Sequence, residues 1–329
     1  MNQKLIGVDI GGTKCAISLG AINESGLILV DKHIFNTGDS TDVDKIISEI
    51  ILSISEVLHR NELTERQIGA IGISCGGPLD VKAGLILSPP NLIGWDNVAI
   101  VDILQKRFDV PVKLQNDANA CTLAEWRFGA ARGYENAVFL TFGTGLGAGL
   151  ILNGKLYSGS NDMAGEVGHI RLTEQGPVGY GKMGSFEGYC SGGGIAQLAK
   201  SKVYEKFQVG QSVTFCPDAR ALEQLDARIV ASAARDGDEL AQEIFHLSGE
   251  SLGKGLAIII DILNPQVIVI GGIFARCHDL LWPSASSVLF RECLPSSLAV
   301  CRVVPAELGD NVGDYAALAV ALNDQEVYA

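Results

Sequence analysis

The stretch Lys4-Leu-Ile-Gly-Val-Asp9-Ile-Gly-Gly-Thr-Lys14 joins an apolar run to a carboxylate, two glycines, a hydroxyl and an ammonium group. The run over residues 4–10 predicts a buried strand. Strand-like runs over 15–22 and 27–35 extend it into an antiparallel meander. A carboxylate beside backbone N–H groups and a hydroxyl is typical of a magnesium–phosphate site. The alternative is a plain hairpin turn with a solvated Lys14.

A second stretch repeats this order further along the chain. Ala137-Val-Phe-Leu-Thr-Phe142 predicts a strand, Gly143-Thr-Gly-Leu-Gly-Ala-Gly149 a turn, and residues 150–152 another strand. Asn153-Gly154 then predicts a tight hairpin. Two copies of one strand–turn–strand unit facing each other predict a two-domain α/β protein with a cleft between the domains. We expect the domain boundary near residue 117.

Alternating helices and strands fill the rest of the chain. Residues 158–195 are glycine-rich, and we expect them to be irregular. The other predicted elements are helices at 43–58, 98–108, 118–128, 225–263 and 312–322, and strands at 68–74, 112–116 and 267–270.

Composition excludes several functional classes. With 25 Lys and Arg against 38 Asp and Glu, the net charge is −13, which argues against nucleic-acid or anionic-membrane binding. It leaves an anionic small ligand open, because backbone N–H groups can hold phosphates. The eight cysteines form no CxxC pair, and residues 1–4 lead directly into a strand. Reduced thiols in a cytoplasmic protein are therefore expected. The most apolar stretch, residues 255–275, is interrupted by Asp261 and Asn264-Pro265, so no membrane span is expected.

Two glycine-rich segments resemble nucleotide-binding fingerprints. Residues 143–148 fit G-x-G-x-x-A, but a strand follows where that fingerprint needs a helix. A phosphate-holding hairpin fits the pattern better, and a plain glycine-rich turn is the alternative. Residues 176–183 nearly match a P-loop, but Met183 replaces the hydroxyl, so we expect only a glycine-rich loop there.

Short polar side chains mark a second set of candidates. Asn116-Asp117 follows a predicted strand and opens a predicted helix, so Asp117 is either a helix cap or a general base. Glu166, His169, Glu187 and Asn91 are of the kind that bind sugar hydroxyls, although a lone histidine is more often structural.

Taken together, these motifs resemble the ROK family of sugar kinases and repressors, within the actin-like ATPase (ribonuclease H-like) superfold. The resemblance covers the whole chain. It rests on Asp9–Lys14, Gly72–Pro78, Pro90–Trp95, Asn116–Ala120, Phe142–Gly149, Ala164–Ile170 and Gly271–Ile273.

The resemblance implies an ATP-dependent kinase that phosphorylates a hexose or N-acetylhexosamine at its primary hydroxyl, with ATP and Mg²⁺ as cofactors and a homodimer as the assembly. It implies that Asp117 is the catalytic base and that Asp9 lies near the magnesium. The implied sugar-binding residues are Gly77, Asn91, Asn116, Asp117, Glu166, His169 and Glu187. The implied ATP-binding residues are Asp9, Gly11, Gly12, Thr13, Lys14, Gly143, Thr144, Gly145, Gly271 and Gly272.

The resemblance also implies the domain organisation. Residues 1–117 would form an N-terminal α/β domain completed by the C-terminal helix, about 311–329, and residues 118–310 a larger C-terminal α/β domain. The sugar would lie in the cleft between them.

One segment departs from the family. The family places three zinc-binding cysteines after His169, but Val178, Tyr180 and Ser185 stand at those positions here, and Cys190 is not at a ligand position. No structural zinc is therefore expected. We expect apolar packing of Tyr180, Met183, Phe186 and Tyr189 to order the loop instead.

Two other functions remain open. A sugar-responsive transcriptional regulator of the same family would carry a DNA-binding domain before the first phosphate motif, where this sequence has eight residues. A non-catalytic sugar-binding protein would not need both phosphate motifs and Asp117.

Overall fold

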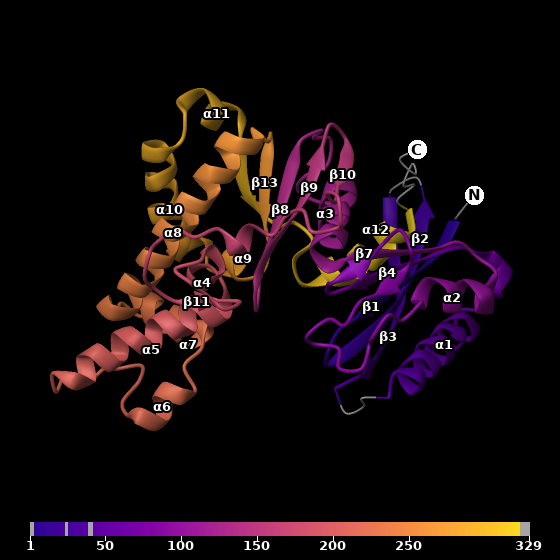
Figure 1. The fold of residues 1–329 in the computed structure, drawn as a ribbon, viewed down its shortest axis with the longest axis horizontal. Helices are drawn as coiled ribbons and strands as arrows, with labels where there is room; N and C mark the ends of the chain where they lie inside the picture. The colour runs from indigo at the N-terminus through magenta and orange to yellow at the C-terminus, as the bar shows by residue number, and fades with distance from the viewer. Residues whose placement is uncertain (1–2, 24–25, 39–41, 323–329) are drawn as a thin grey trace. The chain divides into compact units, whose positions relative to one another are not determined.

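The computed structural model describes residues 3–23, 26–38 and 42–322, and the chain divides into two compact units (Figure 1). Unit 1 comprises Met1–Gly133, Gly149–Ala164 and Glu307–Ala329. Unit 2 comprises Tyr134–Ala148 and Gly165–Ala306. The first segment of unit 1 extends past residue 117, where the sequence pattern placed the boundary, because α3 (Asp117–Phe128) packs against the C-terminal helix α12 (Val312–Leu322).

The sheet of unit 1 confirms the predicted meander. Strand β1 runs antiparallel to β2 and parallel to β4, and β2 pairs antiparallel with β3. The order is β3-β2-β1-β4-β7. The bounds are β1 (Gln3–Ile10), β2 (Lys14–Asn23), β3 (Gly26–Asn36), β4 (Ile68–Cys75) and β7 (Val112–Asn116).

The second sheet repeats that strand order. Its order is β10-β9-β8-β13-β14. When the strands of each sheet are numbered along the chain, both sheets have the order 3-2-1-4-5. The predicted internal repeat is therefore confirmed. Its turn at Asn153-Gly154 has φ values of 52° and 71°, as a two-residue hairpin requires. The bounds are β8 (Ala137–Phe142), β9 (Leu146–Leu152), β10 (Lys155–Tyr157), β13 (Val267–Ile270) and β14 (Arg302–Pro305).

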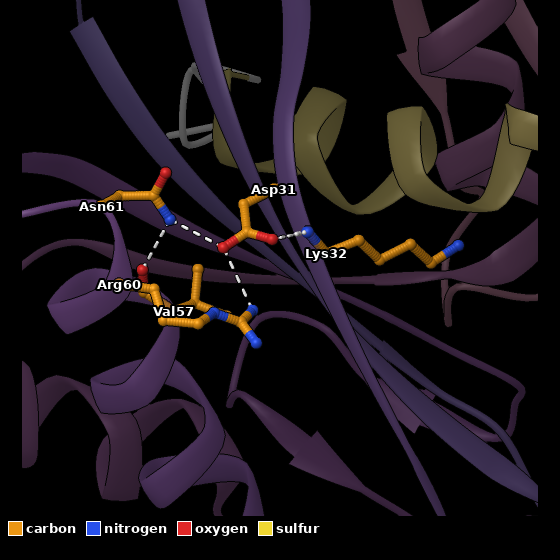
Figure 2. A network of polar contacts seen from close by, with 5 residues as sticks. All are labelled: Asp31, Lys32, Val57, Arg60 and Asn61. Carbon is orange, nitrogen blue, oxygen red and sulfur yellow. Dashed lines mark hydrogen bonds and ion pairs between the residues drawn. The ribbon is translucent and has the colours of Figure 1, made fainter.

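Helices α1 (Val43–Arg60) and α2 (Ile100–Phe108) complete the core of unit 1. The end of α1 is tied to β3 by Asp31, which accepts hydrogen bonds from Arg60 Nη2 (3.0 Å) and Asn61 Nδ2 (2.7 Å) (Figure 2). Partial burial acts to raise the pKa of Asp31, but these donors and the Lys32 N–H hold it below its usual value. The network thus fixes α1 on the sheet.

Helix α12 lies in a groove made by three glycines of neighbouring strands. A Cβ atom on Gly72 would meet Ala317 O at 2.1 Å, and one on Gly7 or Gly20 would lie 2.9 Å from the side chains of Ala317 or Leu318. Asp314 in its first turn, 5% exposed, accepts hydrogen bonds from Ser18 Oγ (3.0 Å) and Lys32 Nζ (2.7 Å). The predicted closing helix at 312–322 therefore covers the first sheet. Residues 323–329 of the predicted segment lie outside the described residues.

Most helices belong to unit 2. The predicted helix over 225–263 is two helices, because Gly237, with φ 92°, breaks it after α7. The prediction of irregular structure through residue 195 was wrong at its end, because Ser191 caps α5 at three successive glycines. None of the described helices is both long and apolar enough to cross a bilayer. The bounds are α4 (Phe186–Tyr189), α5 (Gly192–Gln208), α6 (Ala219–Glu223), α7 (Ala227–Arg235), α8 (Glu239–Leu263), α9 (Ile273–Arg276), α10 (His278–Glu292) and α11 (Pro295–Val300).

Candidate active site

The structure gathers the predicted site residues into two groups, one in each unit. Unit 1 brings together Asp9, Gly11, Gly12, Thr13, Lys14, Gly77, Asn91, Asn116 and Asp117. Unit 2 contains Gly143, Thr144, Gly145, Glu166, His169, Glu187, Gly271 and Gly272.

The Asp9 turn of unit 1 is held by its own strands. Gly11 N–H donates to Lys14 O at 3.0 Å, closing the β1–β2 hairpin. Thr37, at the end of β3, donates from Oγ1 to Gly11 O (2.7 Å) and from its N–H to Thr13 O (2.9 Å). The turn thus has a fixed backbone, with the side chains of Thr13 and Lys14 exposed.

Two further loops close around this turn. A Cβ atom on Gly12 would lie 2.3 Å from Asn91 O, so only glycine lets the Asn91 loop approach so closely. Positions for a Cβ on Gly76 and Gly77 lie 3.6 Å from the Asn91 amide and 3.4 Å from Asn116 Nδ2, respectively. The predicted sugar-binding residues of unit 1 therefore surround one small region next to the Asp9 turn.

Asp117 stands where β7 passes into α3. Asn116, not Asp117, is the N-cap, and its Oδ1 accepts the Ala118 N–H at 3.0 Å. The same N–H lies 2.8 Å from Asp117 Oδ1. Asn116 therefore provides most of the capping of α3, and Asp117, part of whose surface is open to solvent, is available to a ligand.

The electrostatics of this region favour protonation of its carboxylates. Desolvation raises the pKa of Asp9 to about 6, and the charges of Asp117 and Asp314 add to this, while Lys14 and Ser74 act against it. Desolvation also raises the pKa of Asp117, although hydrogen bonds from Ala118 and Asn116 oppose the shift. A carboxylate with a raised pKa is suited to accept a proton near neutral pH.

In unit 2, three glycine-containing loops meet. The 143–145 turn is closed by Gly143 N–H donating to Gly145 O (3.1 Å), and Gly192 N–H at the start of α5 donates to Gly143 O (2.8 Å). A Cβ on Gly272 would lie 2.1 Å from Phe142 O. Strand β9 follows this turn, so the prediction that it is a hairpin and not a dinucleotide fingerprint is confirmed.

Glu187 and His169 lie beside the same turn. Glu187 Oε2 accepts the Leu146 N–H at 3.1 Å. Gly168, the residue before His169, packs against Leu146 and Glu187, because a Cβ there would lie 2.2 Å from Leu146 O and 3.2 Å from Glu187 Cβ. His169 ends the short 3-10 helix Val167–His169, and Glu166 is exposed just before it. Glu187 therefore contacts the end of the predicted phosphate turn directly, and Gly168, next to His169 in the chain, packs against Leu146.

Residues 170–185 do not fit a zinc ion. Ser185 Oγ accepts the Gly188 N–H as the cap of α4, Tyr180 is 73% exposed, and Val178 has no ligating atom in its side chain. Cys190 is buried, which raises the pKa of its thiol, and it donates to Ser248 O. Within the described ranges, no group of three or more His, Cys, Asp or Glu side chains is placed to hold a metal ion.

The expected apolar packing of this segment is only partly right. Phe186 is fully buried, but Tyr180 and Met183 are 73% and 47% exposed. The near match to a P-loop over 176–183 forms a short hairpin, β11 (Val178–Gly179) and β12 (Lys182–Met183), in which Lys182 Nζ donates to His169 O at 2.6 Å.

The sequence patterns missed several supporting residues. Ser74 hydrogen-bonds Asp9. Gln115 Oε1 accepts from Asn116 N (2.8 Å) and Asn119 Nδ2 (3.1 Å), which fixes the β7–α3 junction. Polar residues flanking Asn116-Asp117 in an otherwise apolar strand and helix were the available signal for Gln115 and Asn119. Three glycines after a serine were the signal for the start of α5.

Comparisons with known proteins bear on these groups. A sequence model described as the ROK family matches residues 5–324. A glucokinase of Thermotoga maritima is 33% identical over 313 residues, covering 94% of each chain. A xylose repressor of Caldicellulosiruptor bescii is 26% identical over 325 residues, covering 97% of this chain and 78% of the repressor.

Solved structures agree. A ROK family glucokinase from Streptomyces griseus, in complex with glucose and AMPPNP, is 29% identical with a TM-score of 0.73, covering 97% of this chain and 99% of that one. These similarities and the paired sheets confirm the predicted actin-like ATPase fold with two α/β units.

Proposed function

The chain belongs to the ROK family, and from that premise we propose that it is an ATP-dependent sugar kinase acting on the primary hydroxyl of a hexose or N-acetylhexosamine. Two similar proteins support this proposal: the Thermotoga maritima glucokinase and the Streptomyces griseus glucokinase solved with glucose and AMPPNP.

One observation supports the proposal above the others. Asp117 is partly open to solvent, desolvation by the surrounding protein raises the pKa of its carboxyl group, and Asn116 is the N-cap of α3. A residue needed only as a cap would be redundant there. We assign Asp117 as the base that accepts the proton of the primary hydroxyl while that oxygen attacks the γ-phosphorus in line and ADP leaves.

The sugar is assigned to the polar side chains around Asp117 and Glu187. Such groups orient a sugar through its hydroxyls, and the positioning of the attacking oxygen contributes a large part of phosphoryl-transfer catalysis. The proposed sugar-binding residues are Gly77, Asn91, Asn116, Asp117, Glu166, His169 and Glu187.

The nucleotide is assigned to the glycine turns. Backbone N–H groups of the 11–13 and 143–145 turns would hold phosphate oxygens, with Lys14 adding charge and Gly271–Gly272 taking the adenosine. Asp9 fits a magnesium ion that arrives with ATP, because one carboxylate plus substrate phosphates is a common magnesium environment and the neighbouring acidic charge favours a cation there. Bound magnesium would neutralise charge on the transferring phosphoryl group.

The test is ADP release measured with purified protein, ATP and magnesium across a panel of hexoses and N-acetylhexosamines, with Asp117→Asn as the matched inactive control. ADP release that depends on one sugar and on Asp117 supports the proposal. Sugar binding by calorimetry without ADP release for any sugar would contradict it.

That second outcome would favour a regulator or a non-catalytic sugar-binding protein. The observation that supports a regulator is the similarity to the Caldicellulosiruptor bescii xylose repressor. The homodimer expected from the family resemblance stays a prediction, which light scattering of the purified protein would test.

A further inference from the structure

The segment between His169 and Glu187 contains a small hairpin, β11–β12, which side chains of unit 2 hold in place. Gln197 on α5 contacts Val178 at both backbone atoms: Val178 N–H donates to Gln197 Oε1 (3.1 Å), and Gln197 Nε2 donates to Val178 O (2.9 Å). The pair copies the hydrogen bonding of a neighbouring strand. It anchors β11 to a long helix of unit 2.

The hairpin then reaches back to His169. Across from β11, Lys182 Nζ donates to His169 O at 2.6 Å. The Tyr180 ring meets the imidazole edge-on, with 5.2 Å between ring centroids and an interplanar angle of 76°. Edge-to-face contact at this separation is a favoured aromatic geometry. Backbone and ring of His169 are thus both contacted by one hairpin.

Tyr180 adopts a conformation that a tyrosine seldom takes. Its φ is +43°, although its side chain is 73% exposed and gains little from burial. A non-glycine residue in this region persists only where its surroundings impose it. The turn between β11 and β12 therefore directs the ring onto His169 at a conformational cost.

We propose that the β11–β12 hairpin is a metal-free brace for His169, in which Tyr180 is the positioning residue that sets the orientation of the imidazole. The inference rests on the proposed function, in which His169 contacts the sugar. Tyr180 acts through His169, so its loss affects sugar binding more than the chemical step.

The variants are Tyr180→Ala, which removes the ring, and Tyr180→Phe, which keeps it. Tyr204→Ala, at another exposed tyrosine of unit 2, is the matched control. We expect Tyr180→Ala to raise the KM for the sugar by about tenfold with kcat within about twofold, and the KM for ATP to stay unchanged. Tyr180→Phe and Tyr204→Ala should both behave as wild type.

A second readout does not depend on catalysis. The His169 ring resonances, assigned by their loss in His169→Gln, should shift in Tyr180→Ala, because the ring current of Tyr180 is gone, and stay in place in Tyr180→Phe. Dialysis against EDTA followed by return of magnesium should leave these resonances and the melting temperature unchanged.

The outcomes separate the brace from the function. A wild-type protein that phosphorylates no sugar contradicts the proposed function, and the resonances still test the brace. Unchanged resonances and an unchanged sugar KM in Tyr180→Ala would overturn the brace in an active kinase. Stoichiometric zinc that resists EDTA would overturn it as well.

Discussion

A Cβ atom on Gly145 would lie 3.0 Å from Glu187 Oε2, the oxygen that accepts the Leu146 N–H. The turn assigned to phosphate and a carboxylate assigned to the sugar therefore share one small volume. By contrast, a Cβ on Gly143, two residues earlier, meets no atom within 4 Å. Substitutions at the two glycines should separate the two roles.

Gly145→Ala should displace Glu187 and raise the KM for the sugar by about tenfold, as expected for the loss of one hydrogen bond to a charged group. Gly143→Ala should leave Glu187 in place and raise the KM for ATP alone, because its methyl group occupies space assigned to phosphate. Steady-state kinetics with each substrate varied in turn measures both. If Gly145→Ala raised only the KM for ATP and Gly143→Ala only the KM for the sugar, the phosphate and sugar sides of this turn would have been assigned the wrong way round.

Asp117→Asn should lower kcat by at least about a hundredfold, since general-base catalysis contributes about 10²–10⁴-fold. Folding should persist, because Asn116 caps α3. Because desolvation raises the pKa of Asp117, the wild-type kcat/KM should fall with decreasing pH at a pH above 3.8. A coupled ADP assay and circular dichroism report these effects. Near-normal turnover would return Asp117 to a structural role.

Asp9→Asn should stabilise the ligand-free protein at pH 7. The pKa of Asp9 is raised to about 6, so the folded state binds the proton more tightly, and this group lowers the free energy of unfolding as pH rises from about 4 to 6. Removing the charge should recover about 1–3 kcal/mol at pH 7, and the gain should vanish near pH 4. Urea titrations at both pH values measure it, with the exposed Asp102→Asn as control. Equal stabilities at pH 7 would show that Asp9 is fully hydrated.

Gly72→Ala should destabilise unit 1 by about 3 kcal/mol or more. The added methyl group would meet backbone atoms, Ala317 O at 2.1 Å and Ala321 N at 2.3 Å, which can move only if α12 moves. Gly143→Ala is the matched control in open space. Thermal and chemical unfolding compare the two variants. Equal stability of the Gly72→Ala and Gly143→Ala variants would show that α12 can shift away from β4 at no cost in stability.

The sequence predicted most strands of the two sheets because they are short apolar runs bounded by turns, whereas the edge strand β14 was missed. Strands 112–116 and 267–270 were placed to the residue. Helix α5 was missed, because its first turn is Gly192-Gly-Gly194 and glycine favours no helix. Ser191 caps its start, and Gly188 O, 2.1 Å from the position of a Cβ on Gly194, requires glycine there.

The sequence predicted the motifs of the candidate site but not the contacts between them. Each glycine turn is local in the sequence, so its pattern is visible. The contacts of Gly12 with Asn91 and of Gly145 with Glu187 join residues far apart in the chain, and no periodicity encodes them. Packing of Tyr180 and Met183 failed as a prediction because exposed polar contacts, from Gln197 and Lys182, hold that hairpin.

The seating of α12 has a consequence for how the protein is made. The N-terminus of a chain leaves the ribosome first. The strands of the first sheet are therefore synthesised well before α12, which covers them and follows the whole of Gly165–Ala306. Until then the glycine groove of β1, β2 and β4 is open, and Ser18 and Lys32 lack Asp314. A premature stop codon just before Val312 would therefore keep every proposed active-site residue but remove α12. The uncovered sheet of unit 1 would then be a target for chaperones and proteases.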